Sequence, residues 1–246
     1  MQAPLRSEEA VAVDAVKAID VIAEVVRDAR PGEIPARLCA VAVKLLPVVG
    51  ASVSLRCNGI PVRLGASSAE ASYLAEVQAT LGDGPWRYAS RAGTPVLACD
   101  LTSGRDVYRW PMFAHQVTAA GVQAVYSMPL GDDSVTVGTL DLYRDTPGEL
   151  TEPELRRALL VAAVMTLALT ALPREENGSG GREPWLGGLA TEHDEVYQAI
   201  GMIMAQLGID ADEAVARLRA RAFAQDRTAL EVAHDVVSRR ERLDVG

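Results

Sequence analysis

The basic side chains near the C-terminus are the residues best suited to recognising another molecule. Beyond residue 190 the chain has seven arginines, all after residue 216: Arg217, Arg219, Arg221, Arg227, Arg239, Arg240 and Arg242. A planar guanidinium forms paired hydrogen bonds with phosphates and base edges and stacks on aromatic rings, whereas lysine offers only a point charge. The same region holds eleven acidic residues, so it is not basic overall. The arginines therefore form either a local nucleic-acid-binding surface or a solvated helix face.

A second group of residues suits a small-molecule site. Aromatic residues make up only 4% of the chain, yet the stretch 81–113 contains Trp86, Tyr88, Trp110 and Phe113 among others. Asp100 and Arg109 in the same stretch are polar anchors for a ligand. A concavity lined by aromatic rings with a few polar groups is the usual form of such a site. Alternatively, the rings fill the domain's own core, and Asp100 and Arg109 are a structural pair that pins the loop.

Residue types that support catalysis are sparse and scattered. No histidine has a second metal ligand at the required spacing, and we interpret all three as surface or core residues: His115, His193 and His234. The cysteines lack CxxC spacing and lie in apolar stretches, which indicates buried free thiols: Cys39, Cys57 and Cys99. We therefore expect no catalytic residue, no metal and no cofactor, although haem ligation by His115 stays open.

The overall charge and apolar content limit the class of protein. A net charge of −9 argues against a protein that coats nucleic acid non-specifically, because neutralising phosphates needs excess basic groups. The longest apolar run, at 159–172, is too short to cross a bilayer. The N-terminus lacks the apolar segment of a secretion signal. We expect a cytoplasmic protein that does not associate with membranes.

Apolar periodicity predicts an α+β domain over the first two thirds of the chain. Helices are expected at 11–29, 34–47, 69–79, 112–120 and 151–172. A strand is expected at 94–101, and hairpins are expected around Asn58-Gly59 and Asp132-Asp133. The stretches 81–86 and 102–111 look irregular. This order predicts an antiparallel sheet covered by helices.

A composition change separates this domain from a smaller one. PREENGSGGREPWLGG, at 173–188, is rich in Pro, Gly, Ser and charge, which is typical of a linker. We divide the chain into an N-terminal tail (1–12), a large domain (13–172), a linker (173–190) and a small domain (191–246).

The small domain is expected to be a bundle of three helices of about four turns each. Asp210 with Glu213, and Thr228 with Glu231, have the spacing of N-terminal capping boxes. Gly201 interrupts the first helix at a cost of roughly 1 kcal/mol relative to alanine. We interpret it as a crossing point where another helix approaches closely, with direct contact to a ligand as the alternative.

One further pattern covers nearly all of 191–242 and consists of Ala199, Gly201, Met204, Gly208, Asp212, Glu213, Ala214, Leu218, Arg219, Arg227, Val232 and Ala233. In their joint spacing these residues resemble the ANTAR domain, a three-helix RNA-binding module of transcription antitermination regulators. This resemblance implies RNA binding, for which the candidates are Ala199, Gly201, Arg217, Arg219, Arg221 and Arg227. Many family members have lysine where this chain has Ile200, and Phe223 is the only ring near the arginines for base stacking.

Four motifs of the large domain form a second pattern: LGDGPW (81–86), TPVLACDL (94–101), RWPMF (109–113) and GVQAVYSMPL (121–130). With these motifs the large domain resembles the GAF domains that are fused to ANTAR in actinobacterial regulators. This resemblance implies a sensory domain with a small ligand between the sheet and its covering elements. The ligand candidates are Trp86, Asp100, Arg109, Trp110 and Phe113.

The resemblance as a whole implies a homodimeric regulator that binds a paired-hairpin RNA element and prevents transcription termination. Apolar faces on the helices at 14–29 and 151–172 are candidates for the dimer interface. Two alternatives stay open. The C-terminal bundle could be a protein–protein scaffold with solvated arginines, or the large domain could be an enzyme such as a sulfoxide reductase with reactive cysteines.

Overall fold

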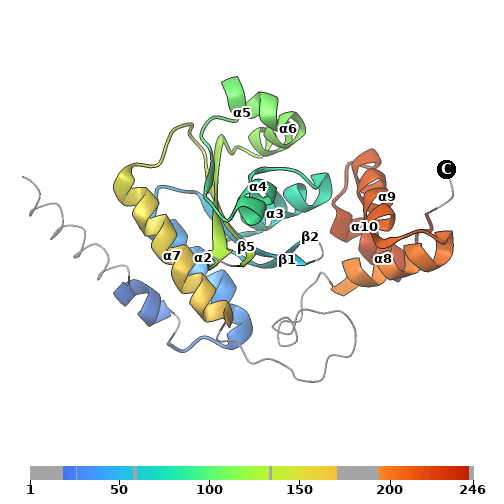
Figure 1. The fold of residues 1–246 in the computed structure, drawn as a ribbon, viewed down its shortest axis with the longest axis horizontal. Helices are drawn as coiled ribbons and strands as arrows, with labels where there is room; N and C mark the ends of the chain where they lie inside the picture. Colours follow the sequence, from blue (N-terminus) through green and yellow to red (C-terminus); the bar gives the residue numbers. More distant parts are fainter. Residues whose placement is uncertain (1–18, 26, 58–59, 133–134, 171–193, 244–246) are drawn as a thin grey trace, which may run out of the picture.

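The computed structural model describes residues 19–25, 27–57, 60–132, 135–170 and 194–243 (Figure 1). Its centre is a five-stranded sheet in the order β2-β1-β5-β4-β3, and every neighbouring pair is antiparallel. The strands are β1 (Gly50–Cys57), β2 (Ile60–Ala66), β3 (Val96–Ala98), β4 (Ala124–Gly131) and β5 (Thr136–Arg144). The predicted α+β class and both hairpins are confirmed, since β1 pairs with β2 and β4 with β5.

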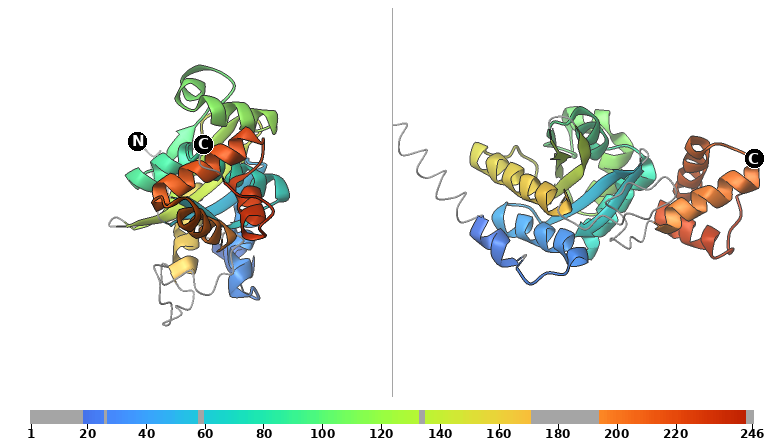
Figure 2. Two further views of the ribbon diagram at one scale, coloured as in Figure 1. Left: turned by 90° about the vertical axis from the view of Figure 1, so that its right-hand side faces the viewer. Right: turned by 60° about the horizontal axis from the view of Figure 1, so that its bottom comes forward.

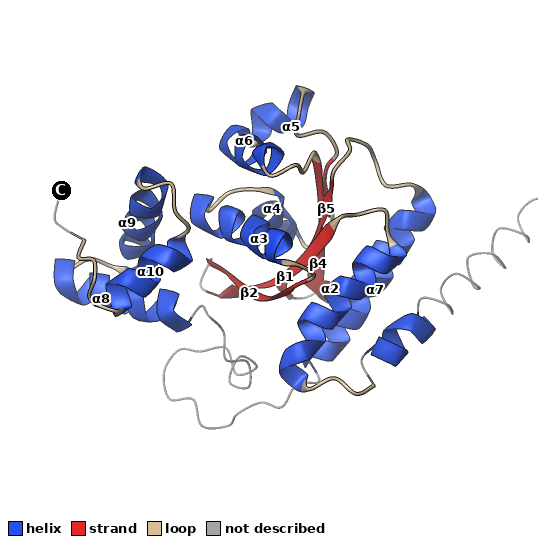
Figure 3. Cartoon of the chain, turned by 180° about the vertical axis from the view of Figure 1, so that it is seen from behind, coloured by secondary structure: helices blue, strands red, loops and turns tan. Residues whose placement is uncertain are grey.

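One face of the sheet is apolar and is covered by two helices, α2 (Ile34–Leu45) and α7 (Glu152–Thr170) (Figure 3). Alternate residues of the strands, including Val53, Met128 and Leu140, point into this layer and are fully buried. The predicted start of α7 is confirmed, because the Thr151 amide donates to the Glu154 carboxylate at 2.7 Å. Residues 19–25 are also helical, but residues 27–28 form a turn, so the expected first helix ends earlier than 29. Its expected residues 11–18 and 26 lie outside the described residues.

The opposite face is covered by α3 (Ala69–Leu81), α4 (Pro85–Ala92) and α6 (Pro111–Ala119). Ser68 caps α3 through its side chain, and Gly82 ends the helix in the left-handed conformation with φ of 63°. Hydrophobic residues of α3 and α6 form a second core with Val125 and Tyr143. The shared sheet is thus sandwiched between two helical layers.

The structure corrects three sequence-based expectations in the region 81–111. Helix α4 begins inside LGDGPW, where Pro85 occupies the first turn and needs no amide partner. A further short helix, α5 (Gly104–Arg109), occupies part of the stretch expected to be irregular. The expected strand at 94–101 is reduced to the three residues of β3. Turn-forming residues such as Pro and Gly occur at helix ends as well as in loops. The sequence pattern alone therefore did not distinguish short helices from loops in this region.

The C-terminal residues form three helices beside the β2 and α3 end of the large domain (Figures 1 and 2). These are α8 (Asp194–Leu207), α9 (Ala211–Ala224) and α10 (Ala229–Val237). Asp210 caps α9, and Thr228 with Glu231 forms a complete capping box for α10. At nine residues, α10 is shorter than the predicted four turns. We refer to residues 194–243 as the C-terminal module; the predicted linker lies outside the described residues.

Gly201 does not mark a helix crossing, so that interpretation is wrong. The residue is exposed on α8, and a Cβ built there would meet no atom within 4 Å. Its neighbour Ala199 is fully buried in the core of the module, so close packing occurs on the other side of the helix. The glycine therefore has no packing role in this structure.

Candidate RNA interface

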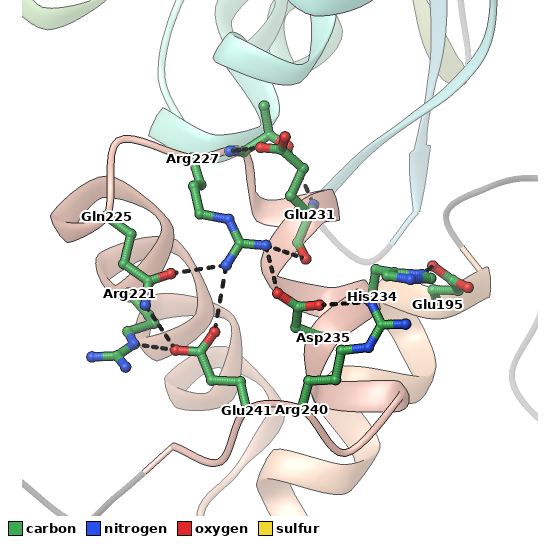
Figure 4. Close-up of polar contacts among 10 residues, drawn as sticks. Glu195, Arg221, Gln225, Arg227, Glu231, His234, Asp235, Arg240 and Glu241 are labelled. Carbon is green, nitrogen blue, oxygen red and sulfur yellow. Dashed lines mark hydrogen bonds and ion pairs between the residues drawn. The ribbon is translucent and has the colours of Figure 1, made fainter.

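Arg227 lies at the centre of a polar network that joins the last two helices and the C-terminal segment (Figure 4). Its Nη2 donates to Asp235 Oδ2 at 2.7 Å and to the Glu231 carbonyl at 3.0 Å. Its Nη1 donates to Gln225 Oε1 at 3.2 Å and lies 3.7 Å from Glu241 Oε2. The hydrogen bond from Arg227 lowers the pKa of Asp235. Arg227 is therefore part of the module's own structure.

Two further candidate arginines on α9 also have carboxylate partners. Arg221 pairs with Glu241, which accepts from Gln225 as well. Arg217 pairs with Glu213 one turn earlier on the same helix, at 3.0 Å. Both arginine side chains keep a third or more of their surface exposed, 46% for Arg221 and 34% for Arg217. Exposed ion pairs of this kind are weak, so a stronger anion can replace the carboxylate.

Arg219 points in a different direction, toward the GAF-like domain. Its Nε donates to the carbonyl of Ala79, in the last turn of α3, at 2.9 Å. Burial, together with nearby Arg87, lowers the pKa of its guanidinium. Its Nη2 is buried and has no hydrogen-bond partner among the described residues. Arg219 is thus withdrawn from solvent in the arrangement described.

The surface of the module also presents groups that are available to a partner. Arg239 and Arg242 are exposed, and no ion pair or hydrogen bond of their side chains is present among the described residues. The ring of Phe223 on α9 is 51% exposed. Gly201 leaves the backbone of α8 open to close approach. Ala199, by contrast, is buried and offers no contact surface.

The predicted ligand residues of the large domain lie mainly in its core. Trp86, Trp110 and Phe113 are each at most 3% exposed. The Arg109 guanidinium lies 4.4 Å from the ring centres of both Tyr88 and Trp110, so it stacks on the aromatic group. The indole N–H groups of both tryptophans are buried and have no partner among the described residues.

Asp100 does not join this aromatic group. Its carboxylate accepts from the backbone and hydroxyl groups of Thr102 and Ser103, just before α5. These hydrogen bonds, those from the two hydroxyls above all, lower the pKa of Asp100 to about 2. The structure therefore gives Asp100 a local role at the start of a helix. Arg109 stacks on Tyr88 and Trp110, and Phe113 lies with Trp110 in one core cluster.

Sequence reasoning missed a buried polar cluster between the sheet and α3. Asp141 of β5 is 1% exposed and accepts hydrogen bonds from Ser127 and, at 3.1 Å, from Gln78 Nε2. Burial raises the pKa of Asp141 to about 6, against the lowering effect of these hydrogen bonds. Ser52 and Thr139 belong to the same face and are also buried. The polar residues alternate along the strands, which is the signal that could have located them, but alternation alone suggests a solvent-facing side.

The described thiols are not activated. Cys39 is fully buried, and burial raises its pKa. Burial also raises the pKa of Cys99, which is partly exposed. In the described part of the chain no group of three metal-ligating side chains comes together, and no helix there is long and apolar enough to cross a membrane.

Comparison with known families agrees with this two-part architecture. Residues 24–170 match the GAF domain family, and residues 190–237 match the ANTAR domain family. The chain is a GAF–ANTAR protein. This pair of domains is that of a regulator. No curated protein matches the chain.

Solved structures resemble the GAF domain of this GAF–ANTAR protein. A GAF domain of a phosphoenolpyruvate-protein phosphotransferase from Coxiella burnetii superposes with a TM-score of 0.51 at 14% identity, covering 65% of this chain and 94% of that one. A GAF domain of the corresponding Acinetobacter protein has a TM-score of 0.49 at 11% identity, covering 64% and 91%. Free methionine-R-sulfoxide reductase from Neisseria meningitidis has a TM-score of 0.47 at 16% identity, covering 64% and 90%. At such identities the likeness shows the fold alone.

Proposed function

We propose that this GAF–ANTAR protein is a transcription antitermination regulator whose C-terminal module binds the loops of a paired-hairpin RNA. The observation that carries the proposal is the ANTAR match over 190–237, on a module whose surface presents Phe223 and the exposed Arg239 and Arg242. Unpaired loop bases are recognised by stacking on rings and guanidinium planes and by hydrogen bonds at their edges. Because nascent RNA is the target, the protein acts in the cytoplasm.

Arg217 and Arg221 complete the proposed surface when each releases its glutamate partner and binds RNA instead. Their carboxylate pairs are partly exposed, so a phosphate or base edge can replace the glutamate at small cost. Arg227 is assigned an indirect part, since its hydrogen bond holds Asp235 in place and its ion pair helps to hold Glu241 beside Arg221. Gly201 is proposed as a point of close backbone approach, while Ala199 supports α8 from within the core.

The proposal is tested by measuring the affinity of the full chain for a synthetic RNA with two adjacent hairpins. Arg221→Ala is expected to weaken binding by about 1–3 kcal/mol if the guanidinium reads a base. Arg156→Ala is the matched control, because Arg156 is also a half-exposed arginine paired with one glutamate, on α7. Equal affinities for the wild type and both variants would contradict the assignment of Arg221.

A scaffold that binds no RNA is the second candidate function. It is favoured by one observation: each of the four candidate arginines has a partner within the chain. Absence of binding to hairpin RNA at low salt, where phosphate contacts are strongest, would favour this alternative.

We also propose a homodimer, with the exposed stripe of α7 as its interface. Leu159 and Leu167 lie eight residues apart on one side of the helix and are 40% and 68% exposed. The aromatic group around Trp110 is proposed as the place where a small ligand is sensed, since the buried indole N–H of Trp110 has no hydrogen-bond partner among the described residues.

Finally, we propose that the GAF domain has no sulfoxide reductase activity. Such an enzyme needs a reactive thiolate, and burial raises the pKa of both described thiols. Thiol labelling of the native protein tests this: uniformly slow labelling is expected, and one fast-reacting cysteine would contradict it.

A further inference from the structure

The C-terminal module is docked on the last turn of α3 through two hydrogen bonds, in each of which a side chain of one domain bonds to the backbone at a helix end of the other. The carbonyl of Ala79 lies in that turn, and such carbonyls lack a partner within their own helix. It accepts from Arg219 Nε at 2.9 Å. The amide of Ala229, the first residue of α10, also lacks an intrahelical partner and donates to Thr80 Oγ1 at 2.8 Å. Arg219 of the module thus provides a hydrogen-bond donor to the C-terminal end of α3, and Thr80 of the GAF domain provides an acceptor to the N-terminal end of α10.

Apolar contacts surround these two hydrogen bonds. A small hollow between the domains is lined by Pro61 and Ala79 on one side and by Val196, Ile200 and Leu218 on the other. Arg219 lies close against α3, because a Cβ at Gly82 would come within 2.6 Å of its Nη1. The contact therefore covers a continuous part of the module rather than one side chain.

The covered part of the module includes residues expected to face RNA. Arg219 is a candidate RNA-binding residue, and Ile200 lines the same hollow between the domains. Here Ile200 is 6% exposed and faces the GAF domain. An isoleucine at this position suits an apolar docking contact and offers nothing to a phosphate.

We propose that docking on α3 and binding of RNA exclude each other, so that the described arrangement is the silent state of the regulator. This inference rests on the proposed RNA-binding function and adds its regulation. Undocking exposes the Arg219 guanidinium, whose buried Nη2 has no partner here, together with the amide end of α10. Water satisfies both helix ends after release, so the two states differ little in hydrogen bonding. Apparent RNA affinity then falls in proportion to the undocked fraction.

The test weakens docking from the GAF side and leaves the module unchanged. Ala79→Lys places a bulky cation opposite Arg219, and Thr80→Val removes the hydroxyl that accepts from the Ala229 amide. Ala69→Lys is the matched control, because Ala69 is exposed at the far end of α3. If Ala79→Lys disturbs folding, Thr80→Val still tests the contact.

Two readouts are taken on the full chain: affinity for a pool of two-hairpin RNAs with randomised loops, and hydrogen exchange of the Ala229 amide. Both docking variants are expected to exchange faster at Ala229 and to bind RNA about tenfold more tightly, with Ala69→Lys like wild type. RNA added to the wild type is expected to speed exchange at Ala229, since linkage is reciprocal.

The outcomes separate this inference from the proposed function. Faster exchange with measurable but unchanged RNA affinity overturns the inference and leaves RNA binding in place. If RNA binds to the wild type while the Ala229 amide stays protected from exchange, the inference is likewise overturned and RNA binding remains in place. If neither the wild type nor the undocked variants bind any RNA of the pool, RNA binding itself is contradicted, and the inference falls with it.

Discussion

Individual side chains in this protein have roles that depend on what surrounds them. Three arginines on α9, within five residues of one another, face three environments. Arg217 pairs along its own helix, Arg219 reaches the GAF domain and Arg221 binds a glutamate beyond α10. A shared residue type on one helix therefore does not imply a shared function.

Gly201 provides a prediction at a single position. Gly201→Ala is expected to raise the free energy of unfolding by about 0.5–1 kcal/mol, because the position is helical and open and alanine restricts the unfolded chain. Urea denaturation measures this change. RNA affinity is expected to fall if the backbone approaches RNA here.

Ala205→Gly, at an exposed position one turn later on α8, is the control for this substitution. It is expected to lower stability by a similar amount and leave RNA affinity unchanged. Destabilisation by Gly201→Ala would mean that the helix packs against something at this point.

Asp141 provides a prediction about pH. Its folded pKa of about 6 exceeds the value near 3.9 of an unfolded aspartate, so the folded state holds more protons between these values. Stability contributed by this group is therefore lost as pH rises from about 4 to about 6, by roughly 3 kcal/mol. In Asp141→Asn this decline is expected to be absent, which denaturation at several pH values measures.

Asp100 is the control for the pH prediction, because its pKa is shifted in the opposite direction, to about 2. Its stabilising contribution is present above the unfolded pKa and lost as pH falls toward 2. Asp100→Asn should therefore change the profile only below about pH 4. If stability depends on pH in the same way in Asp141→Asn and in the wild type, burial does not raise the pKa of Asp141 as proposed.

Among the secondary-structure elements, the helix starts are the features most directly encoded by local sequence. Thr228 accepts from the Glu231 amide, and the Glu231 carboxylate accepts from the Thr228 amide, as the spacing predicts. The strands of the two predicted hairpins are paired as expected. Short helices were harder to predict from the sequence, because α4 and α5 have too few residues for a periodic apolar pattern.

The capping box of α10 gives a prediction at the level of one helix. Thr228→Ala is expected to destabilise the module by about 1 kcal/mol, because it leaves the Glu231 amide without its side-chain partner. The module's thermal unfolding, followed by circular dichroism, measures the effect. Ser238→Ala, at the exposed C-terminal end of the same helix, should change stability much less. Equal losses would indicate that the cap contributes nothing specific.

The whole molecule is a sheet between two helical layers with a separate helical module docked at one end (Figures 1 and 3). The proposed dimer belongs at this level. Leu167→Glu on α7 is expected to weaken self-association at least about tenfold, because it buries a charge in an apolar interface. Sedimentation equilibrium measures the dissociation constant.

Val135→Glu is the control for the dimer, because Val135 is a comparably exposed apolar residue, 58% accessible, between β4 and β5. If Leu167→Glu and Val135→Glu change the dissociation constant of the dimer equally, α7 is not the interface.

Local patterns in the amino-acid order were enough to predict the α+β class, both hairpins, the starts of helices such as α7, α9 and α10, and the resemblance to GAF and ANTAR domains. These features depend on interactions between residues a few positions apart, such as a cap and the amide three residues later. The environments of Arg219 and Asp141 could not be obtained in this way. Arg219 meets a carbonyl 140 positions earlier in the chain, and Asp141 meets a glutamine 63 positions earlier. Whether a polar group lies in water or under a helix depends on which distant segment packs over it, and that is settled by assembly of the whole fold.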